Sequence, residues 1–528
     1  MTLALRQLQV HAGTRRLLGP LDLELAPGRC LGVVGESGSG KSLTALALLG
    51  LLPNGLRASG EVVRDAVVIP LGARIAPEHA ALRGRVLGWV PQDPLASLHP
   101  LRSIGAQLRE TLRAHGRPDR EARDLLARVH LPDPDAALAR FPHQFSGGQR
   151  QRIAIALALC SGPRYLIADE PTSALDARIA REVLDLLDAL RREEGLGLML
   201  ISHDLPLVGA YAEDVLVLRR GDVVERGATR AVFAAPTQDY TRELIEADRI
   251  RTPAPHSGNR HENADRASTD VLKTAGPLLR GEALTMRYPC APKPALDRVD
   301  IVLHRGEGLA LLGESGSGKS TLGRALLRLL RGAQGRVWID GVEFTAQRGA
   351  ALRALRGRIG VVFQDPYASL DPRMRVGDIV SEPLRIHGDG DAASRAEKAR
   401  ELLAAVGLDA AMVERWPHQF SGGQRQRIAI ARALARDPDL LVCDEAVSAL
   451  DAHHRRGILE LLSSLKRERG LALLFVTHDL AAAAAVAERI AVLEAGRIVE
   501  IGDTADVLGA PQHAHTQALV EARKLQRA

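Results

Sequence analysis

The sequence GESGSGKS stands at residues 35–42 and is repeated without change at residues 313–320. A short apolar run precedes each copy, and a stretch with the apolar periodicity of a helix follows it, at 43–51 and 322–330. The order of strand, glycine-rich loop and helix fits the pattern G-x-x-x-x-G-K-[ST] of phosphate-binding loops. One match could be an ordinary glycine-rich turn, but two identical copies in equivalent surroundings argue against that explanation.

Both loops carry the residue types that hold the phosphates of a nucleotide. Glycines let backbone N–H groups surround phosphate oxygens, and the following helix presents its positively polarised N-terminus to them. We expect Lys41 and Lys319 to reach the β- and γ-phosphates, and Ser42 and Ser320 to hold Mg²⁺. The glycines of the two cradles are Gly35, Gly38 and Gly40, and Gly313, Gly316 and Gly318.

The two halves of the chain repeat one another. The loop lysines, Lys41 and Lys319, lie 278 positions apart, so the repeat is a doubled domain and not a short structural repeat. We expect one domain at residues 1–251 and a second at 278–528. Residues 252–277 are rich in Pro, Ser, Asn, His and charge, which favours a flexible linker.

Apolar runs alternate with helical periodicity in each half, which predicts an α/β fold with a mainly parallel sheet. Ligand groups should then gather at the carboxyl ends of the strands. Each half closes with a hairpin-like pattern, at 215–227 and 490–502, so an antiparallel part is expected too. The stretches at about 93–145 and 365–420 indicate a smaller helical subdomain in each half.

Two acidic residues follow a buried-looking strand in each half. Asp169 and Asp444 suit a second contact to Mg²⁺. Glu170 and Glu445 come next, where a carboxylate could position or deprotonate an attacking water. A solvated acid at a strand end, or a helix N-cap, is the structural alternative, and the surrounding motifs disfavour it.

The sequence FSGGQRQRIAIA is also present twice, at 145–156 and 420–431. Serine followed by glutamine three residues later is a capping-box pattern, so a well-capped helix is the structural explanation. Two glycines in the first turn nevertheless cost the helix roughly 1 kcal/mol each. They make sense if the helix N-terminus approaches an anion, such as a γ-phosphate bound by the opposite half. The residues concerned are Ser146, Gly147, Gly148 and Gln149, and Ser421, Gly422, Gly423 and Gln424.

Composition excludes several other classes. The formal charge of +6 comes without a clustered basic stripe or interleaved aromatic residues, so nucleic acid is not an expected partner. Cys30, Cys160, Cys290 and Cys443 form no close pairs, which disfavours a zinc or iron–sulfur site and suits a reducing compartment. The best apolar stretch, 43–52, is too short to span a bilayer, and the N-terminus lacks the apolar region of a signal peptide. We expect a soluble chain whose membrane role comes through partners.

These motifs resemble the ABC superfamily of ATPases over nearly the whole chain, in two copies. The resemblance implies two tandem ABC-type P-loop nucleotide-binding domains, each with a mainly parallel sheet core, an antiparallel β part and a helical subdomain. It identifies GESGSGKS as the Walker A loop, FSGGQ as the signature and SALD, at 173–176 and 448–451, as the D-loop. Gln92 and Gln364 match the Q-loop glutamine, which belongs to the ATP and Mg²⁺ site, and His203 and His478 match the catalytic switch histidine.

The resemblance narrows to the peptide/nickel importer ATPases. QDPLASLHP at 92–100, QDPYASLDP at 364–372 and PHQFSGGQRQR in both halves are similar to that family. It implies that two distinct ATPases of a dipeptide or oligopeptide permease are fused here. The expected partners are two membrane permease subunits and a solute-binding protein as separate chains, with the ATPase peripheral on the cytoplasmic face of the inner membrane. It also implies that the two halves pair head to tail, each signature closing the other half's site.

One position departs from the family pattern, which places an aromatic residue under the adenine ring. Tyr288 fits that role in the second half, whereas Ala12 takes the place in the first.

A ribosome-associated translation factor and a fused sugar-importer ATPase are the alternatives to a peptide-importer ATPase. The short, turn-rich linker disfavours the first, and the intact motifs of the second half disfavour the other. The cargo stays open among dipeptides, longer peptides, glutathione, peptide antibiotics and metal chelates.

Overall fold

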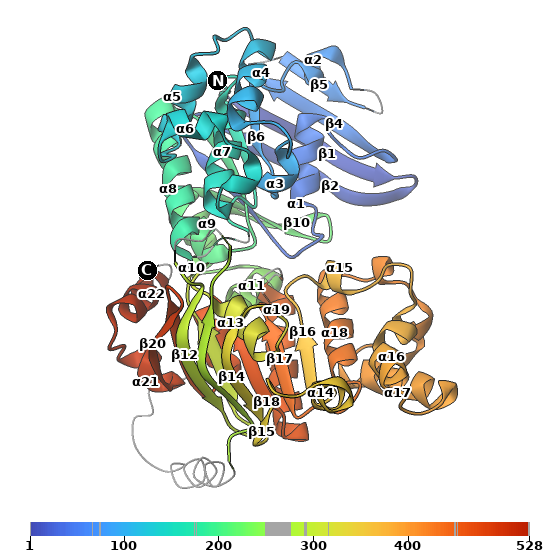
Figure 1. Ribbon diagram of the computed structural model, residues 1–528. Coiled ribbons are helices and arrows are strands. Elements are labelled where there is room, and N and C mark those ends of the chain that lie inside the picture. Colours follow the sequence, from blue (N-terminus) through green and yellow to red (C-terminus); the bar gives the residue numbers. More distant parts are fainter. Residues whose placement is uncertain are drawn as a thin grey trace. The chain divides into compact units, whose positions relative to one another are not determined.

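The computed structural model describes residues 2–65, 67–72, 75–173, 175, 177–248, 276–289, 293–314, 316–447, 450 and 452–525. It divides into two compact units, one for each half of the chain, and the division of the sequence falls between residues 249 and 250 (Figure 1). Almost all of the expected linker at 252–277 lies outside the described residues. Each unit is therefore described by itself.

The first unit contains two sheets and a set of helices. Its antiparallel sheet has the order β2-β1-β4-β5, and its larger sheet has the order β10-β9-β3-β8-β7-β6. The strands are β1 (Leu3–Ala12), β2 (Arg15–Leu25), β3 (Cys30–Val34), β4 (Leu56–Arg64), β5 (Val67–Leu71), β6 (Leu87–Val90), β7 (Tyr165–Asp169), β8 (Gly197–Ile201), β9 (Asp214–Arg219) and β10 (Asp222–Ala228). The helices are α1 (Lys41–Leu49), α2 (Pro77–Ala80), α3 (Pro94–Ser97), α4 (Ile104–Ala114), α5 (Glu121–Arg128), α6 (Pro134–Ala139), η1 (Pro142–Gln144), α7 (Gly147–Leu159), α8 (Ala177–Glu194), α9 (Leu205–Tyr211), α10 (Thr229–Ala234) and α11 (Asp239–Asp248).

The second unit repeats this plan. Its sheets have the orders β12-β11-β14-β15 and β16-β17-β18-β13-β19-β20. The strands are β11 (Leu279–Met286), β12 (Leu296–Leu303), β13 (Gly308–Leu312), β14 (Gln334–Ile339), β15 (Val342–Glu343), β16 (Ile359–Val362), β17 (Leu440–Asp444), β18 (Ala472–Val476), β19 (Arg489–Glu494) and β20 (Arg497–Asp503). The helices are α13 (Lys319–Leu326), α14 (Gly349–Arg356), α15 (Pro366–Ser369), α16 (Val376–His387), α17 (Ala392–Ala405), η2 (Ala410–Glu414), η3 (Pro417–Gln419), α18 (Gly422–Ala433), α19 (Ala452–Arg469), α20 (Leu480–Val486), α21 (Thr504–Gly509) and α22 (Ala514–Leu525).

The expected α/β fold is confirmed, because five strands of each larger sheet run parallel and a hairpin closes its edge. In the first unit the central strands are buried along their whole length, as parallel strands covered on both faces should be. Leu198 and Leu200 of β8 pack with α4, α5, α7 and α8 on one face. Met199 and Ile201 pack with α1 and the antiparallel sheet on the other. Between β6 and α7 the chain is helical.

One helix is shorter than its apolar pattern predicts. α13 ends at Leu326, although apolar residues continue to Leu330. Arg328 has a φ of 54°, in the left-handed region, and its side chain donates hydrogen bonds to Phe344 O (3.1 Å) and Gln347 O (2.7 Å). These tertiary contacts end the helix early, which a periodicity argument cannot anticipate.

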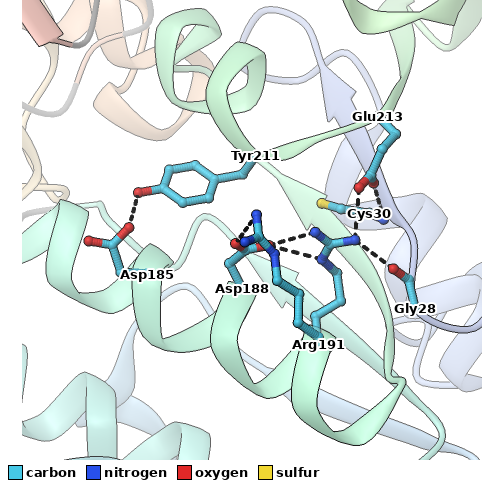
Figure 2. A network of polar contacts seen from close by, with 8 residues as sticks. Gly28, Cys30, Asp185, Asp188, Arg191, Tyr211 and Glu213 are labelled. Atoms are coloured by element: carbon cyan, nitrogen blue, oxygen red, sulfur yellow. Dashed lines mark hydrogen bonds and ion pairs between the residues drawn. The ribbon is translucent and has the colours of Figure 1, made fainter.

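A polar network fixes the start of β3, the strand that leads into the first glycine-rich loop (Figure 2). Arg191 of α8, buried among polar groups, donates to Gly28 O (2.5 Å) and Asp188 Oδ1 (2.7 Å) and pairs with Glu213 Oε1 (2.8 Å). Glu213 Oε2 in turn accepts a hydrogen bond from the backbone N–H of Cys30 (2.7 Å). Burial raises the pKa of the Cys30 thiol, so this cysteine is a core residue and not a reactive one.

No helix among the described residues is both long and apolar enough to cross a membrane.

Candidate nucleotide sites

Each glycine-rich loop joins a central parallel strand to a helix, β3 to α1 and β13 to α13. Gly35 and Gly313 have φ values of 149° and 155°, and a Cβ there would lie 2.2 Å from Leu218 O or 2.4 Å from Leu493 O. Only glycine therefore lets the loop pass so close to the neighbouring strand. At the crest of each loop, Gly38 and Gly316 also have positive φ, with open space where a Cβ would stand. A glycine-rich loop with open space before a helix N-terminus can accommodate the phosphates of a nucleotide.

The loop lysines are held over their own loops. Lys41 Nζ donates to the carbonyls of Gly35 (2.8 Å) and Glu36 (2.9 Å). Lys319 Nζ makes the same two bonds, to Gly313 O and Glu314 O, both at 2.7 Å. Both lysines are buried, so each ammonium group is fixed at the loop where phosphate charge would be neutralised.

A hydroxyl and a carboxylate meet beside each loop. Ser42 Oγ donates to Asp169 Oδ1 (3.0 Å), and Ser320 Oγ donates to Asp444 Oδ1 (2.9 Å). Burial raises the pKa of Asp169 from 3.8 to about 6; the Ser42 hydrogen bond opposes this rise and the charge of Glu170 adds to it. Burial also raises the pKa of Asp444. One carboxylate and one hydroxyl next to a phosphate site form the oxygen donor set that Mg²⁺ prefers.

A second carboxylate in each half lies at the centre of a small polar cluster. Glu170 Oε2 accepts a hydrogen bond from Gln92 Nε2 (2.9 Å) and lies 3.3 Å from His203 Nδ1. Glu170 Oε1 is 3.9 Å from the ammonium group of Lys41. Gln92, Glu170 and His203 follow the ends of three adjacent parallel strands, β6, β7 and β8. The structure thus brings together residues that the sequence separates by more than 100 positions.

The second half has the same cluster. Gln364 Nε2 donates to Glu445 Oε2 (2.7 Å), and His478 Nδ1 lies 3.6 Å from Glu445 Oε1. Burial acts to raise the pKa of Glu445, but the hydrogen bond and charge of His478 and the charge of Lys319 outweigh it, so the pKa is lowered. The carboxylate is therefore ionised at neutral pH, as a base or a water-positioning group requires.

Both of these glutamates carry backbone strain that the sequence did not reveal. Glu170 and Glu445 have φ values of 46° and 50°, in the left-handed region. The backbone N–H of each donates to the neighbouring strand, to Ile201 O and Val476 O, both at 2.9 Å. Such strain costs about 1–3 kcal/mol and persists where the surrounding structure imposes it, often at functional sites. The same φ recurs in both halves, as it also does at paired turn positions such as Arg220 and Ala495, so the strain accompanies the site and does not by itself identify it.

The signature segments begin helices with the expected capping box. Ser146 Oγ accepts from Gln149 N (3.3 Å), and Gln149 Oε1 accepts from Ser146 N (3.1 Å). In the second half, Ser421 Oγ accepts from Gln424 N (3.3 Å), and Gln424 Oε1 accepts from Ser421 N (3.0 Å). The capping serines are exposed, so both helix N-termini face outwards.

The two glycines of each signature have different surroundings. A Cβ on Gly148 would lie 2.4 Å from Ile179 Cγ2 of α8, and one on Gly423 would lie 2.3 Å from His454 Cδ2 of α19. The second glycine of each pair is thus required by helix packing, a reason that the sequence pattern does not contain. Gly147 and Gly422 meet nothing closer than 3.4 Å, so helix packing does not require the first glycine, and ligand clearance stays a prediction for it.

The two sites differ in two side chains. Tyr288 follows β11, is 38% exposed, and its hydroxyl lies 3.4 Å from Thr321 Oγ1 at the start of α13. Arg324 Nη2 lies 3.8 Å from Asp444 Oδ2, whereas Leu46 occupies the corresponding position of α1. Sequence reasoning identified Tyr288 but missed Arg324, although the Leu46/Arg324 difference between two otherwise similar helices was the available signal. Half of the first D-loop and most of the second, including Asp176 and Asp451, lie outside the described residues.

Known proteins are similar to this chain along most of its sequence. The model of the ABC transporter family matches residues 18–173 and 296–448, more than half of the chain. A protein named glutathione import ATP-binding protein GsiA from Salmonella choleraesuis (strain SC-B67) is 41% identical over 532 residues, which cover 95% of this chain and 85% of that protein. The protein of the same name from Escherichia coli (strain K12) gives the same identity and coverage. A dimeric ATP-binding cassette, MJ0796, solved in a post-hydrolysis state with ADP and Pi, is 32% identical, with a TM-score of 0.40 over 43% of this chain and 98% of that one.

The matched ranges each contain one glycine-rich loop, one signature and one Asp-Glu pair. Both halves are thereby covered by the family, and the relatives are similar along almost the whole chain. The chain belongs to the ABC transporter family and is an ATPase with two ATP-binding domains in one polypeptide.

Proposed function

We propose that each half of the chain binds one ATP with one Mg²⁺ and hydrolyses it. The observation that carries this proposal is the repetition of one arrangement in both halves: a lysine on its loop, a serine bonded to an aspartate, and a glutamate bonded to a glutamine beside a histidine. The two halves repeat one plan, and each has every member of this arrangement, which favours a use in both.

Each side chain then has a definite role. Lys41 and Lys319 neutralise phosphate charge, and Ser42 with Asp169, or Ser320 with Asp444, hold the metal together with the Q-loop glutamine. ATP supplies the phosphoanhydride bond whose cleavage drives the cycle. Glu170 and Glu445 orient the attacking water and accept its proton; the lowered pKa of Glu445 keeps that carboxylate ionised at neutral pH. Gln92 and His203, and their counterparts Gln364 and His478, hold the glutamate in place.

We propose further that the halves pair head to tail, so that each signature helix closes the opposite nucleotide site. Ser146 and Ser421 cap exposed helix N-termini that carry no acidic residue in the first turn. Such a terminus attracts an anion. The γ-phosphate then links the two halves, and its removal by hydrolysis releases them.

The transport role proposed for the chain is to energise an importer of glutathione or related short peptides. Its support is the 41% identity to proteins named for glutathione import, together with the intact site residues in both halves. The chain acts peripherally at the cytoplasmic face of the membrane, on two separate permease subunits that receive cargo from a solute-binding protein. Exposed apolar side chains of the helical segment, Leu95 and Leu101, suit contact with a permease, since Leu101 is 81% exposed.

Affinity purification of the tagged chain from gently solubilised host membranes, followed by mass spectrometry, tests this role. We expect two polytopic membrane proteins to copurify with the parent chain. Leu101→Glu should lose them and keep its basal ATPase activity, whereas Val67→Glu, at an exposed apolar position of β5, should keep both. Copurification of ribosomal proteins without permeases would overturn the transport role. Equal recovery of permeases with Leu101→Glu would refute the proposed contact.

A further inference from the structure

The segment after the larger sheet of the first half returns to the nucleotide loop. Glu225 of β10 accepts hydrogen bonds from Thr237 N and Thr237 Oγ1, both at 2.8 Å, and from Gln238 N at 3.3 Å. This carboxylate fixes the turn from which α11 begins. The next residues along the helix are therefore held in a defined place relative to the sheet.

Tyr240, in the first turn of α11, contacts the loop directly. Its hydroxyl oxygen accepts a hydrogen bond from the backbone N–H of Glu36 at 3.2 Å, and the side chain is 4% exposed. The guanidinium carbon of Arg219 lies 4.4 Å from the centre of the tyrosine ring, and this cation–π contact restrains the ring. A buried, stacked tyrosine has little freedom to rotate, so it supplies a fixed acceptor for the loop.

The same loop residue is also bound to the catalytic lysine. Glu36 N–H donates to Tyr240, and Glu36 O accepts from Lys41 Nζ at 2.9 Å. The backbone N–H of Glu36 is thus bonded to α11, and its backbone carbonyl is bonded to Lys41, the lysine that neutralises phosphate charge. The position of Glu36 consequently sets the position of one of the two carbonyls that hold Lys41.

We infer that Tyr240 is a positioning residue for the first nucleotide site: it orders the phosphate loop through Glu36 and so prepares Lys41 for ATP. The inference rests on the proposed nucleotide site. It assigns a role in ATP binding to α11, the second helix after the β9–β10 hairpin, which none of the nucleotide-site motifs includes.

The second half keeps the anchoring carboxylate but replaces the tyrosine. Glu500 accepts hydrogen bonds from Gln512 N (2.9 Å) and His513 N (3.0 Å), as Glu225 does in the first half. His515 stands at the position of Tyr240, and its Nδ1 lies 3.5 Å from Oε1 of Glu494, which stands at the position of Arg219. The tyrosine that contacts the first loop therefore has a histidine as its counterpart in the second half, so the effect of the tyrosine hydroxyl belongs to the first site.

Tyr240→Phe removes the hydroxyl and keeps the ring. ATP affinity is measured by calorimetry on the full chain in two backgrounds: Lys319→Ala, which leaves the first site, and Lys41→Ala, which leaves the second. We expect Tyr240→Phe to weaken ATP binding roughly two- to tenfold in the first background, the effect of one lost hydrogen bond, and to leave binding in the second background unchanged. Tyr211→Phe is the matched control, because it removes a tyrosine hydroxyl of the same unit that donates to Asp185 Oδ1 (2.6 Å) and not to Glu36 (Figure 2).

Hydrogen exchange without nucleotide gives an independent readout. The Glu36 amide should exchange faster in Tyr240→Phe than in the parent chain or in Tyr211→Phe. Parent-like affinity in the Lys319→Ala background, together with parent-like exchange at Glu36, would overturn the inference while the nucleotide site stands. Absence of ATP binding in the Lys319→Ala chain that carries Tyr240 would overturn the first nucleotide site itself, and with it this role of Tyr240.

Discussion

The two adjacent glycines of the first signature allow a sharp separation of packing from function. Gly148 is buried, and an added Cβ would stand 2.4 Å from Ile179 Cγ2, well inside the contact distance of about 3.5–4.0 Å between carbon atoms. Ile179 is β-branched and lies in α8, so its Cγ2 cannot rotate away freely. Gly147 is exposed, and its added Cβ would meet only Leu175 Cδ2, at an ordinary 3.4 Å.

Gly148→Ala should therefore destabilise the first unit. Overpacking costs about 1–3 kcal/mol, and the better helix propensity of alanine returns up to about 1 kcal/mol, so we expect a net loss of about 1–2 kcal/mol. Gly147→Ala should leave stability unchanged or raise it by up to about 1 kcal/mol. The same substitution should lower ATPase activity at least tenfold, because the methyl group stands at the helix N-terminus proposed to approach the γ-phosphate.

Urea unfolding without nucleotide, followed by tryptophan fluorescence, measures stability, and steady-state ATP hydrolysis by the folded variants measures function. Gly422→Ala and Gly423→Ala form the matched pair in the second half, where the close atom is His454 Cδ2 at 2.3 Å. The reasoning is refuted if Gly148→Ala is as stable as the parent. It is also refuted if Gly147→Ala hydrolyses ATP at the parent rate.

Three further predictions concern the sites themselves. Glu170→Gln and Glu445→Gln should each slow ATP turnover and leave ATP affinity within about twofold of the parent, because they remove the base and keep the phosphate cradle; a parent-like rate in either would disprove that assignment. Ala12→Tyr should tighten ATP binding to the first site when measured in a Lys319→Ala chain, by supplying the ring that Tyr288 offers in the second half; unchanged affinity would count against an adenine-stacking role. The pKa of Asp169 is raised from 3.8 to about 6 on folding, so the ionised carboxylate destabilises the nucleotide-free chain above pH 6, and this cost disappears as pH falls through 6 towards 4. Asp169→Asn should thus raise the free energy of unfolding by up to about 3 kcal/mol at pH 8 and by little at pH 4; a stability gain that does not depend on pH would contradict the assigned cause.

Much of the fold and of the sites followed from the sequence because their signals are local. A glycine-rich loop between an apolar run and a helical stretch predicts its own conformation, and Lys41 and Ser42 then take positions that the loop dictates. The strand-end residues Asp169, Glu170 and His203 were also predictable, because the carboxyl ends of parallel strands meet at one edge of a sheet.

Other features depend on contacts between distant residues. The need for glycine at position 148 comes from Ile179 on another helix, and the early end of α13 comes from bonds between Arg328 and Phe344. The left-handed backbone of Glu170 and the contact of Tyr240 with Glu36 are likewise set by tertiary structure. Residue types and spacing carry no information about such contacts until the strands and helices are in place.

The central claim is that one chain holds two complete ATP sites. Equilibrium binding of ATP with Mg²⁺ to the purified full-length chain, counted as nucleotides per polypeptide, tests it most directly. The parent chain should bind two ATP, Lys41→Ala and Lys319→Ala one each, and the double variant none. A parent chain that binds a single ATP, or a double variant that still binds two, would contradict the account.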